Sequence, residues 1–139
     1  MPAPPQAHRR VWLLLGWGMV LSVVVLSLVP LNVDLDEGRD KIAHSLAYAG
    51  MSFWFGMLFG GRARQSGIAV AFAAMGVVIE FLQGMTGYRT FDPFDMIANG
   101  VGAALGWGLV QTPLGNALGW TESRLQRLKG KSRGEARLR

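Results

Sequence analysis

The sequence contains no cysteine and few charged residues, and each absence excludes a class of protein. Without cysteine the chain has no disulfide, no thiolate metal site and no cysteine nucleophile. Charged residues make up 17% of its 139 residues, whereas soluble domains carry about 25%. Half of the residues are apolar, and they gather in long blocks. The composition therefore predicts a small membrane protein rather than a soluble domain.

The apolar blocks predict four transmembrane helices, at about residues 11–29, 42–60, 67–85 and 96–112. The first block would reach about 28 Å as a helix, close to the hydrocarbon thickness of about 30 Å. A cleaved signal peptide is the alternative for this block, but the hydrophobic region of a signal peptide is shorter, about 7–15 residues. We therefore expect one transmembrane domain over residues 11–112.

The distribution of lysine and arginine predicts the orientation of these helices. Eleven of the 14 basic residues lie in the arm at residues 1–10, the turn at 61–66 and the tail at 113–139. Positive charge marks the cytoplasmic side. We therefore predict an all-α, four-transmembrane-helix bundle, multi-pass in the bacterial cytoplasmic (inner) membrane, with both termini cytoplasmic.

The net charge of +5 does not predict a nucleic-acid partner, because the basic residues flank the apolar blocks. The tail at residues 113–139 could lie along the inner leaflet through its apolar residues, with its cations near anionic lipid. We expect instead a solvated and mostly disordered cytoplasmic end. The lipid bilayer is the first predicted partner, and a homo-oligomer is compatible with the sequence.

Polar residues fall at the outer ends of the predicted helices, and no comparable group is expected at the inner ends. A charge in hydrocarbon costs at least about 2.5–3.5 kcal/mol, so these residues should face the bundle interior. Their helical spacing gives each helix one polar face. The sequence therefore predicts one polar site open to the outside, formed by Asp40, Lys41, His44, Tyr48, Glu80, Gln83, Arg89, Asp92, Asp95 and Asn99.

Some of these residues have predicted structural roles. Asp40 and Asp95 are expected to be N-caps. Arg89 could be held by a neighbouring acidic residue, or could clamp a phosphate or carboxylate. Small residues spaced four apart allow close helix packing in lipid; the candidates are Gly56, Gly60, Gly102 and Gly106.

The order of these residues resembles a known family. The pattern runs through Asp40-Lys41-x-x-His44-x-x-x-Tyr48, Glu80-x-x-Gln83 and Arg89-x-Phe91-Asp92-x-x-Asp95-x-x-x-Asn99-x-x-Gly102-x-x-x-Gly106. It is similar to the VanZ-like family of small bacterial integral membrane proteins, relatives of the teicoplanin-resistance protein VanZ. The resemblance implies the fold and the membrane location. It also implies a link to glycopeptide susceptibility, through a mechanism that the family leaves open.

The main functional hypothesis is a non-enzymatic protein that binds a lipid-linked or peptidyl head group of the cell envelope, or the glycopeptide itself. Lys41 and Arg89 would hold anionic groups, while Glu80, His44 and Asn99 would orient the ligand. This hypothesis requires no cofactor and no metal.

Three alternatives remain open. A membrane enzyme could use His44, Glu80 and Asp95 as general acid–base groups or as a metal set. A transporter of a lipid-linked molecule could use Glu80 as a proton site. The polar residues could also form a buried latch that only fixes the helices.

Overall fold

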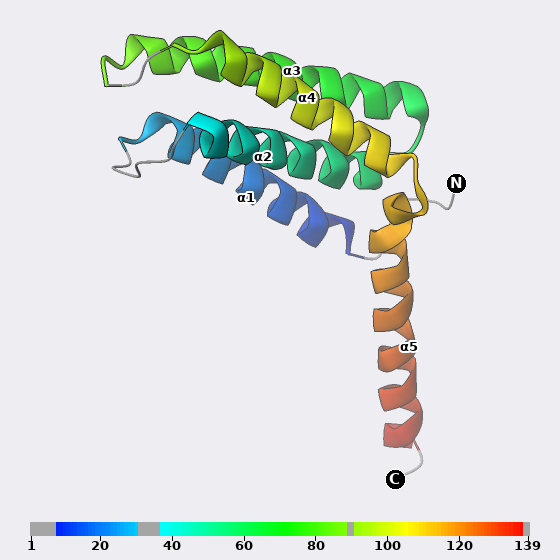
Figure 1. The fold of residues 1–139 in the computed structure, drawn as a ribbon. Coiled ribbons are helices and arrows are strands. Elements are labelled where there is room, and N and C mark those ends of the chain that lie inside the picture. The colour runs from blue at the N-terminus through cyan, green and yellow to red at the C-terminus, as the bar shows by residue number, and fades with distance from the viewer. Residues whose placement is uncertain (1–7, 31–36, 89–90, 138–139) are drawn as a thin grey trace.

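The structure, a computed structural model, describes residues 8–30, 37–88 and 91–137, and the described chain is helical apart from short turns. Four antiparallel helices form a bundle, and a fifth leaves it at a steep angle (Figure 1). In chain order the elements are α1 (Arg9–Leu28), α2 (Glu37–Leu58), α3 (Arg62–Met85), α4 (Pro93–Val110), the 3₁₀ helix η1 (Pro113–Asn116) and α5 (Ala117–Arg137).

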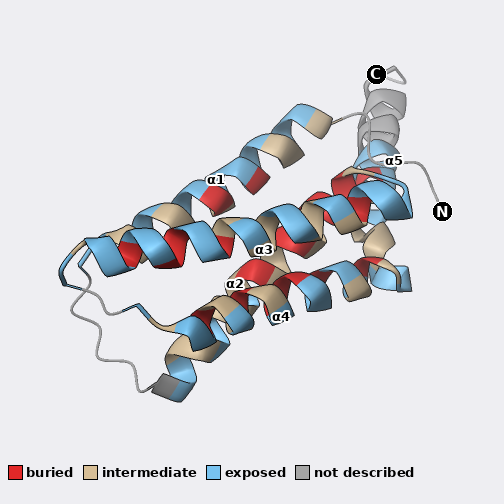
Figure 2. Cartoon of the chain, turned by 90° about the horizontal axis from the view of Figure 1, so that it is seen from above, coloured by how far each residue is buried: buried red, intermediate tan, exposed pale blue. Residues whose placement is uncertain are grey.

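The helices α2, α3 and α4 begin three to five residues earlier than the apolar blocks at 42–60, 67–85 and 96–112. The reason is that polar first turns, such as the one that opens α2 at Glu37, are helical although they are not apolar. By length and composition, α1 and α3 are the two described helices that qualify as membrane spans. Much of the surface of both helices is exposed (Figure 2). Their exposed residues include large apolar side chains such as Leu14, Leu21 and Val70.

The central contact of the bundle is between α2 and α4. A Cβ atom at Gly102 would clash with the backbone carbonyl of Ser45, and one at Gly106 with the carbonyl of Ala49. Ser45 in turn donates a hydrogen bond of 3.0 Å to the carbonyl of Ala98. The missing side chains on α4 therefore let the two backbones touch.

The other predicted pair of small residues lies differently. A Cβ at Gly56 would stand 2.6 Å from Cγ2 of Val110, so this glycine also admits α4. Gly60 follows the last residue of α2, Leu58. It therefore lies beyond the helix and does not continue its packing face.

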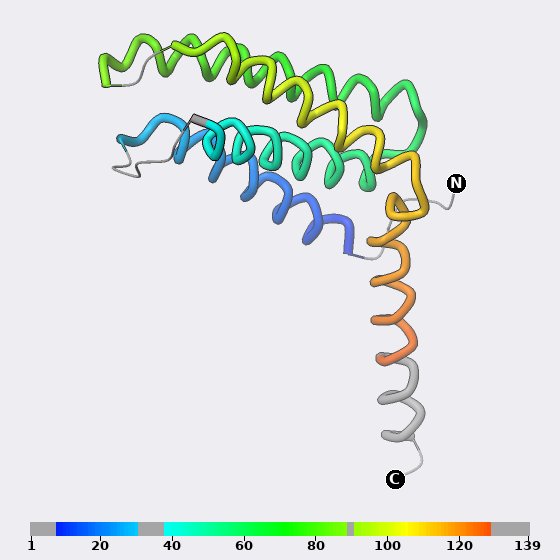
Figure 3. Tube along the Cα trace, viewed as in Figure 1, coloured from blue at the N-terminus to red at the C-terminus, as the bar shows by residue number. Residues whose placement is uncertain are grey.

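The prediction of a mostly disordered tail is wrong for Ala117–Arg137, which forms α5. The sequence of α5 is rich in residues of high helix propensity, such as leucine, arginine and lysine. Its first turns also have contacts with the bundle. Leu118 is buried, and Oε1 of Glu122 accepts hydrogen bonds from the backbone N–H of His8 (3.0 Å) and from Nε1 of Trp12 (3.1 Å). The starts of α1 and α5 consequently lie at the same end of the bundle (Figure 3).

Candidate functional site

Polar side chains from three helices meet at the end of the bundle where α2 and α4 begin and α3 ends. We call this region the carboxylate end. Its members are Asp40, Lys41 and His44 of α2, Glu80 of α3, and Asp92, Asp95 and Asn99 at the start of α4. Arg89, the further residue predicted for this site, lies outside the described residues.

The ammonium group of Lys41 joins α2 to the start of α4. Its Nζ atom lies 2.8 Å from Oδ2 of Asp92 and 3.5 Å from Oδ1 of Asp95. The other oxygen of Asp92 accepts a hydrogen bond of 2.8 Å from the backbone N–H of Phe94. The hydrogen bond from Lys41 and the one from Phe94 lower the pKa of Asp92, because both favour the carboxylate.

Both predicted N-caps are wrong. Asp92 caps α4, while Asp95 lies in its first turn. The cause is Pro93, which suits the first helical position because it has no N–H to satisfy, so the cap must precede it. Asp40 is likewise inside α2, which begins at Glu37. Carboxylates in first turns are favoured by the positive end of the helix dipole.

Glu80 is the most deeply buried carboxylate of the carboxylate end, with 1% of its surface exposed. Its Oε1 atom accepts a hydrogen bond of 2.7 Å from the backbone N–H of Asp92. Its Oε2 atom is buried and has no hydrogen-bond partner among the described residues. Glu80 therefore ties α3 to the cap of α4 and keeps one oxygen unused.

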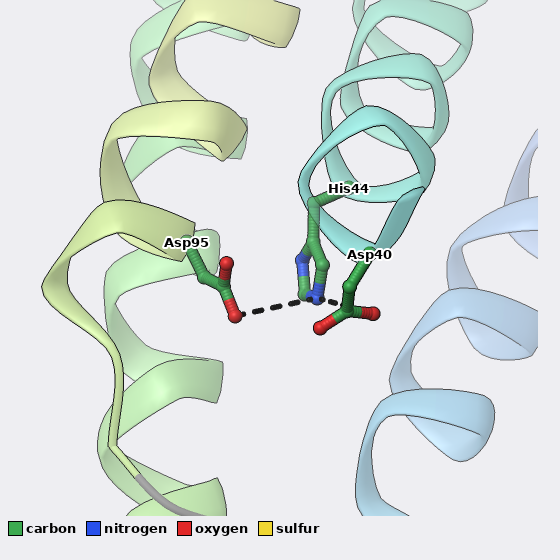
Figure 4. A group of neighbouring side chains, drawn as sticks. All are labelled: Asp40, His44 and Asp95. Carbon is green, nitrogen blue, oxygen red and sulfur yellow. Dashed lines mark ion pairs between the residues drawn. The ribbon is translucent and has the colours of Figure 1, made fainter. Parts of the chain in front are cut away.

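His44 lies between the two aspartates of α2 and α4. Its Nδ1 atom is 3.0 Å from Oδ1 of Asn99, a buried amide that packs against Gly76 of α3. Its Nε2 atom is 3.9 Å from Oδ1 of Asp40 and 3.9 Å from Oδ2 of Asp95. Figure 4 shows the imidazole ring between the two carboxylates.

Tyr48 and Gln83 contribute to the packing of α1. The ring of Tyr48 is 2% exposed and lies in the hydrophobic core with Val20 of α1. The side-chain amide of Gln83 donates a hydrogen bond of 2.8 Å to the carbonyl of Ser27, near the end of α1. The hydroxyl of Tyr88 donates to the next carbonyl, that of Leu28. These polar groups hold the end of α1 against α3.

A second polar group, which was not predicted from the sequence, lies at the opposite end of the bundle. We call it the glutamine end. Nε2 of Gln65 donates a hydrogen bond of 3.0 Å to the carbonyl of Gly56, and Oε1 of Gln65 accepts one of 3.0 Å from Nε2 of Gln111. Both glutamines line a cavity of about 310 Å³ that also contacts Gly60 and Thr112. In the sequence this group is marked only by an amide side chain near the start of α3 and another just after α4. Neither side chain is ionisable, so the pattern of charged residues does not indicate it.

The carboxylate end contains donor atoms of the kinds that bind metal ions. Atoms from Asp40, His44 and Asp95, one from each, all lie within 4.8 Å of one another. The main hypothesis from the sequence requires no metal, and the enzyme alternative groups His44 with Glu80 and Asp95. The structure instead places Asp40, one helical turn before His44, beside the imidazole.

The chain matches the model of the family described as VanZ/LLP1 over residues 9–114. No curated protein and no solved structure matches the chain. The matched region includes α1 to α4 and every residue of the carboxylate end, and it covers well over half of the sequence. The chain therefore belongs to the VanZ/LLP1 family.

Proposed function

We propose that this VanZ/LLP1-family protein spans the bacterial cytoplasmic membrane four times and that its carboxylate end binds a head group in the outer leaflet. The ligand would be a cell-envelope component, such as a lipid-linked precursor. Binding would alter susceptibility to glycopeptides such as teicoplanin. The wider family resemblance supports the drug class, and the geometry supports the place of binding.

The observation that carries the proposal is the buried carboxylate of Glu80. Buried polar atoms in proteins are nearly always hydrogen-bonded, because leaving one unpaired costs about 1–3 kcal/mol. Oε2 of Glu80 has no partner among the described residues, and neither does Oδ1 of Asp95 by hydrogen-bond geometry. A latch that only fixed the helices would gain nothing from such atoms. A binding site would use them to contact its ligand.

The surface around the bundle supports a position within the bilayer. Large apolar side chains are exposed on each of the four bundle helices, for example Leu21 of α1, Leu46 of α2, Val70 of α3 and Leu105 of α4. Contiguous apolar surface of this kind is unfavourable in water and matches a hydrocarbon environment. The charged groups of the carboxylate end would then lie near the water boundary.

The orientation can be tested by cysteine labelling, because the natural chain contains no cysteine. Ala63→Cys places a thiol in the first turn of α3, and Thr86→Cys places one just after its last residue. In intact cells a membrane-impermeant maleimide should label the thiol at position 86. It should reach position 63 only after permeabilisation. The reverse pattern would contradict the proposed orientation.

The function can be tested with two matched substitutions of buried glutamates, Glu80→Gln and Glu122→Gln. Glu122 is 6% exposed and lies on α5, remote from the carboxylate end. Each variant replaces the wild-type protein in a deletion strain, with protein levels compared by immunoblot. Binding of a labelled lipid-linked precursor is measured in nanodiscs. Glu80→Gln should abolish the effect on teicoplanin susceptibility and weaken binding at least tenfold, whereas Glu122→Gln should retain both. Unchanged susceptibility and binding in Glu80→Gln would refute the proposed site.

A further inference from the structure

Three electron-pair donors face one another at the carboxylate end. They are Oδ1 of Asp40, Nε2 of His44 and Oδ2 of Asp95, and the imidazole nitrogen is 3.9 Å from each oxygen. These separations are too long for hydrogen bonds. Figure 4 shows the three groups pointing toward a common space between α2 and α4.

The second nitrogen of His44 fixes the tautomer of the ring. Oδ1 of Asn99, 3.0 Å from Nδ1, is an oxygen that can only accept a hydrogen bond. Nδ1 therefore carries a proton, and Nε2 is the ring nitrogen that remains to bind an ion. Nε2 faces the two carboxylates. This is the arrangement in metal-binding histidines, where an outer partner holds one N–H and the other nitrogen binds the ion.

Asp95 lies at the edge of this space, with Oδ2 toward His44 and Oδ1 toward Lys41. The residue is 7% exposed, and its Oδ1 atom is buried without a hydrogen bond among the described residues. The ammonium group of Lys41 lies 3.5 Å from that oxygen, but it is held more closely by Asp92, at 2.8 Å. The helix dipole explains acidic residues in the first turns of α2 and α4. It does not explain a histidine ring nitrogen placed between them.

We propose that Asp40, His44 and Asp95 bind a divalent metal ion of the Zn²⁺ or Mn²⁺ class. A mixed imidazole and carboxylate set suits these ions better than Ca²⁺ or Mg²⁺, which prefer oxygen ligands alone. Ligand atoms about 2.1 Å from a tetrahedral ion lie about 3.4 Å apart. The two observed separations of 3.9 Å would therefore close by about half an ångström on binding, which small side-chain rotations allow.

The metal site deepens the proposed function. The carboxylate end contains four acidic side chains (Asp40, Glu80, Asp92 and Asp95), against Lys41 and His44 among the described members. This excess of acid would repel a phosphate head group. A divalent ion with open coordination positions would offset most of the local negative charge and offer a direct ligand for phosphate oxygens. This last role rests on the proposed function, whereas metal binding itself does not.

The test is metal titration of the purified full-length protein in detergent, without any lipid ligand. Zn²⁺ and Mn²⁺ are titrated separately by calorimetry after chelator treatment, with detergent alone as the blank. We expect one ion per chain with micromolar or tighter affinity for at least one of the two metals. X-ray absorption of the loaded wild-type protein should show one imidazole nitrogen with oxygen ligands. Absence of binding above the blank would overturn the proposal without any variant.

Paired variants locate the site. The chain has two histidines, His8 and His44, so His8→Gln is the control for His44→Gln. Asp40→Asn and Asp95→Asn should each weaken binding at least tenfold, as should His44→Gln. Asn99→Ala removes the hydrogen-bond partner of Nδ1 of His44 and should weaken metal binding by about 10–100-fold. Equal binding in all variants, or loss in His8→Gln alone, would contradict the assignment. Susceptibility and precursor binding of Glu80→Gln are measured separately, so either proposal can fail while the other stands.

Discussion

The two ends of the bundle bury polar groups in opposite ways. The carboxylate end gathers charged side chains and leaves buried oxygens of Glu80 and Asp95 without hydrogen bonds. The Gln65–Gln111 group at the glutamine end uses neutral amides, beside the buried Glu122 of α5, and Gln65 is satisfied at both its nitrogen and its oxygen. Oε1 of Gln111 has no hydrogen bond among the described residues and belongs to a residue that lines a 310 Å³ cavity. A polar cavity of that size has room for water.

The difference separates a structural role from a binding role. A neutral amide is less costly to bury than a carboxylate, and its hydrogen bonds hold the chain at the break between α2 and α3. Buried charges with unused oxygens add little to stability. Sites with such groups are commonly retained for function at the expense of stability. We therefore expect stability to depend more on the glutamine end and function more on the carboxylate end.

The largest effect on stability is expected at the contact between α2 and α4, which joins the two ends of the bundle. Gly102→Ala places a methyl group against the carbonyl of Ser45 and forces α2 and α4 apart. Overpacking of this kind should lower the free energy of unfolding by about 3 kcal/mol. Gly100→Ala is the control, because nothing lies within 4 Å of its Cβ position. The control should be neutral, or stabilising by up to about 1 kcal/mol. Equal unfolding midpoints in detergent for the two variants would contradict the close packing of α4 against α2 at Gly102.

Gln65→Leu tests the glutamine end directly. The substitution leaves the carbonyl of Gly56, in the last turn of α2, without its partner. It also removes one of the two hydrogen bonds that Nε2 of Gln111 donates, while the one to the carbonyl of Trp107 remains. The expected loss is about 2 kcal/mol. Glu80→Gln at the other end should change stability by less than about 1 kcal/mol, since its oxygen can still accept from the N–H of Asp92. The comparison of the two ends fails if Glu80→Gln is the more destabilising variant.

Much of the carboxylate end could be predicted from the sequence, because the cost of burying charge forces polar faces to meet. The details depended on longer-range contacts. The sequence placed Asp40 as an N-cap, yet its spacing of four residues from His44 already allowed the observed neighbouring positions. The pairing of Gln65 with Gln111 joins residues 46 apart. No local pattern predicts such a contact.

The ordered structure of α5 could not be predicted from local sequence patterns either. Its composition is basic and polar, and such composition is common in disordered ends. What orders its first turns is tertiary: the burial of Leu118 and the hydrogen bonds of Glu122 to α1. Propensity favoured the helix, but only those contacts place it against the bundle.

Glu122→Ala should weaken the attachment of α5 to α1 and should destabilise the protein less than Gln65→Leu. The substitution removes the acceptor for the N–H groups of His8 and Trp12. We expect a loss of about 1 kcal/mol in local stability and little change in global unfolding. Amide hydrogen exchange should become faster in α5 and in the first turn of α1. Unchanged exchange there would show that Leu118 alone holds α5.

The smallest stability effect through a single ion pair should come from the pair of Lys41 and Asp92 at the carboxylate end. Lys41→Met removes this pair, together with the longer contact of 3.5 Å to Asp95. Both side chains are about one-third exposed, so water and salt screen the pair. The interaction between Lys41 and Asp92 should instead be visible in the pH dependence of the folding stability. The lowered pKa of Asp92 means that the folded state holds fewer protons than the unfolded state in acid. This stabilising contribution is present above the unfolded pKa of about 3.9 and is lost as pH falls through the lower folded value. Unfolding midpoints followed from about pH 6 to about pH 3 should therefore fall less steeply in Lys41→Met than in the wild type. Parallel profiles would show that the hydrogen bond from Phe94, which the variant retains, is enough to lower the pKa of Asp92.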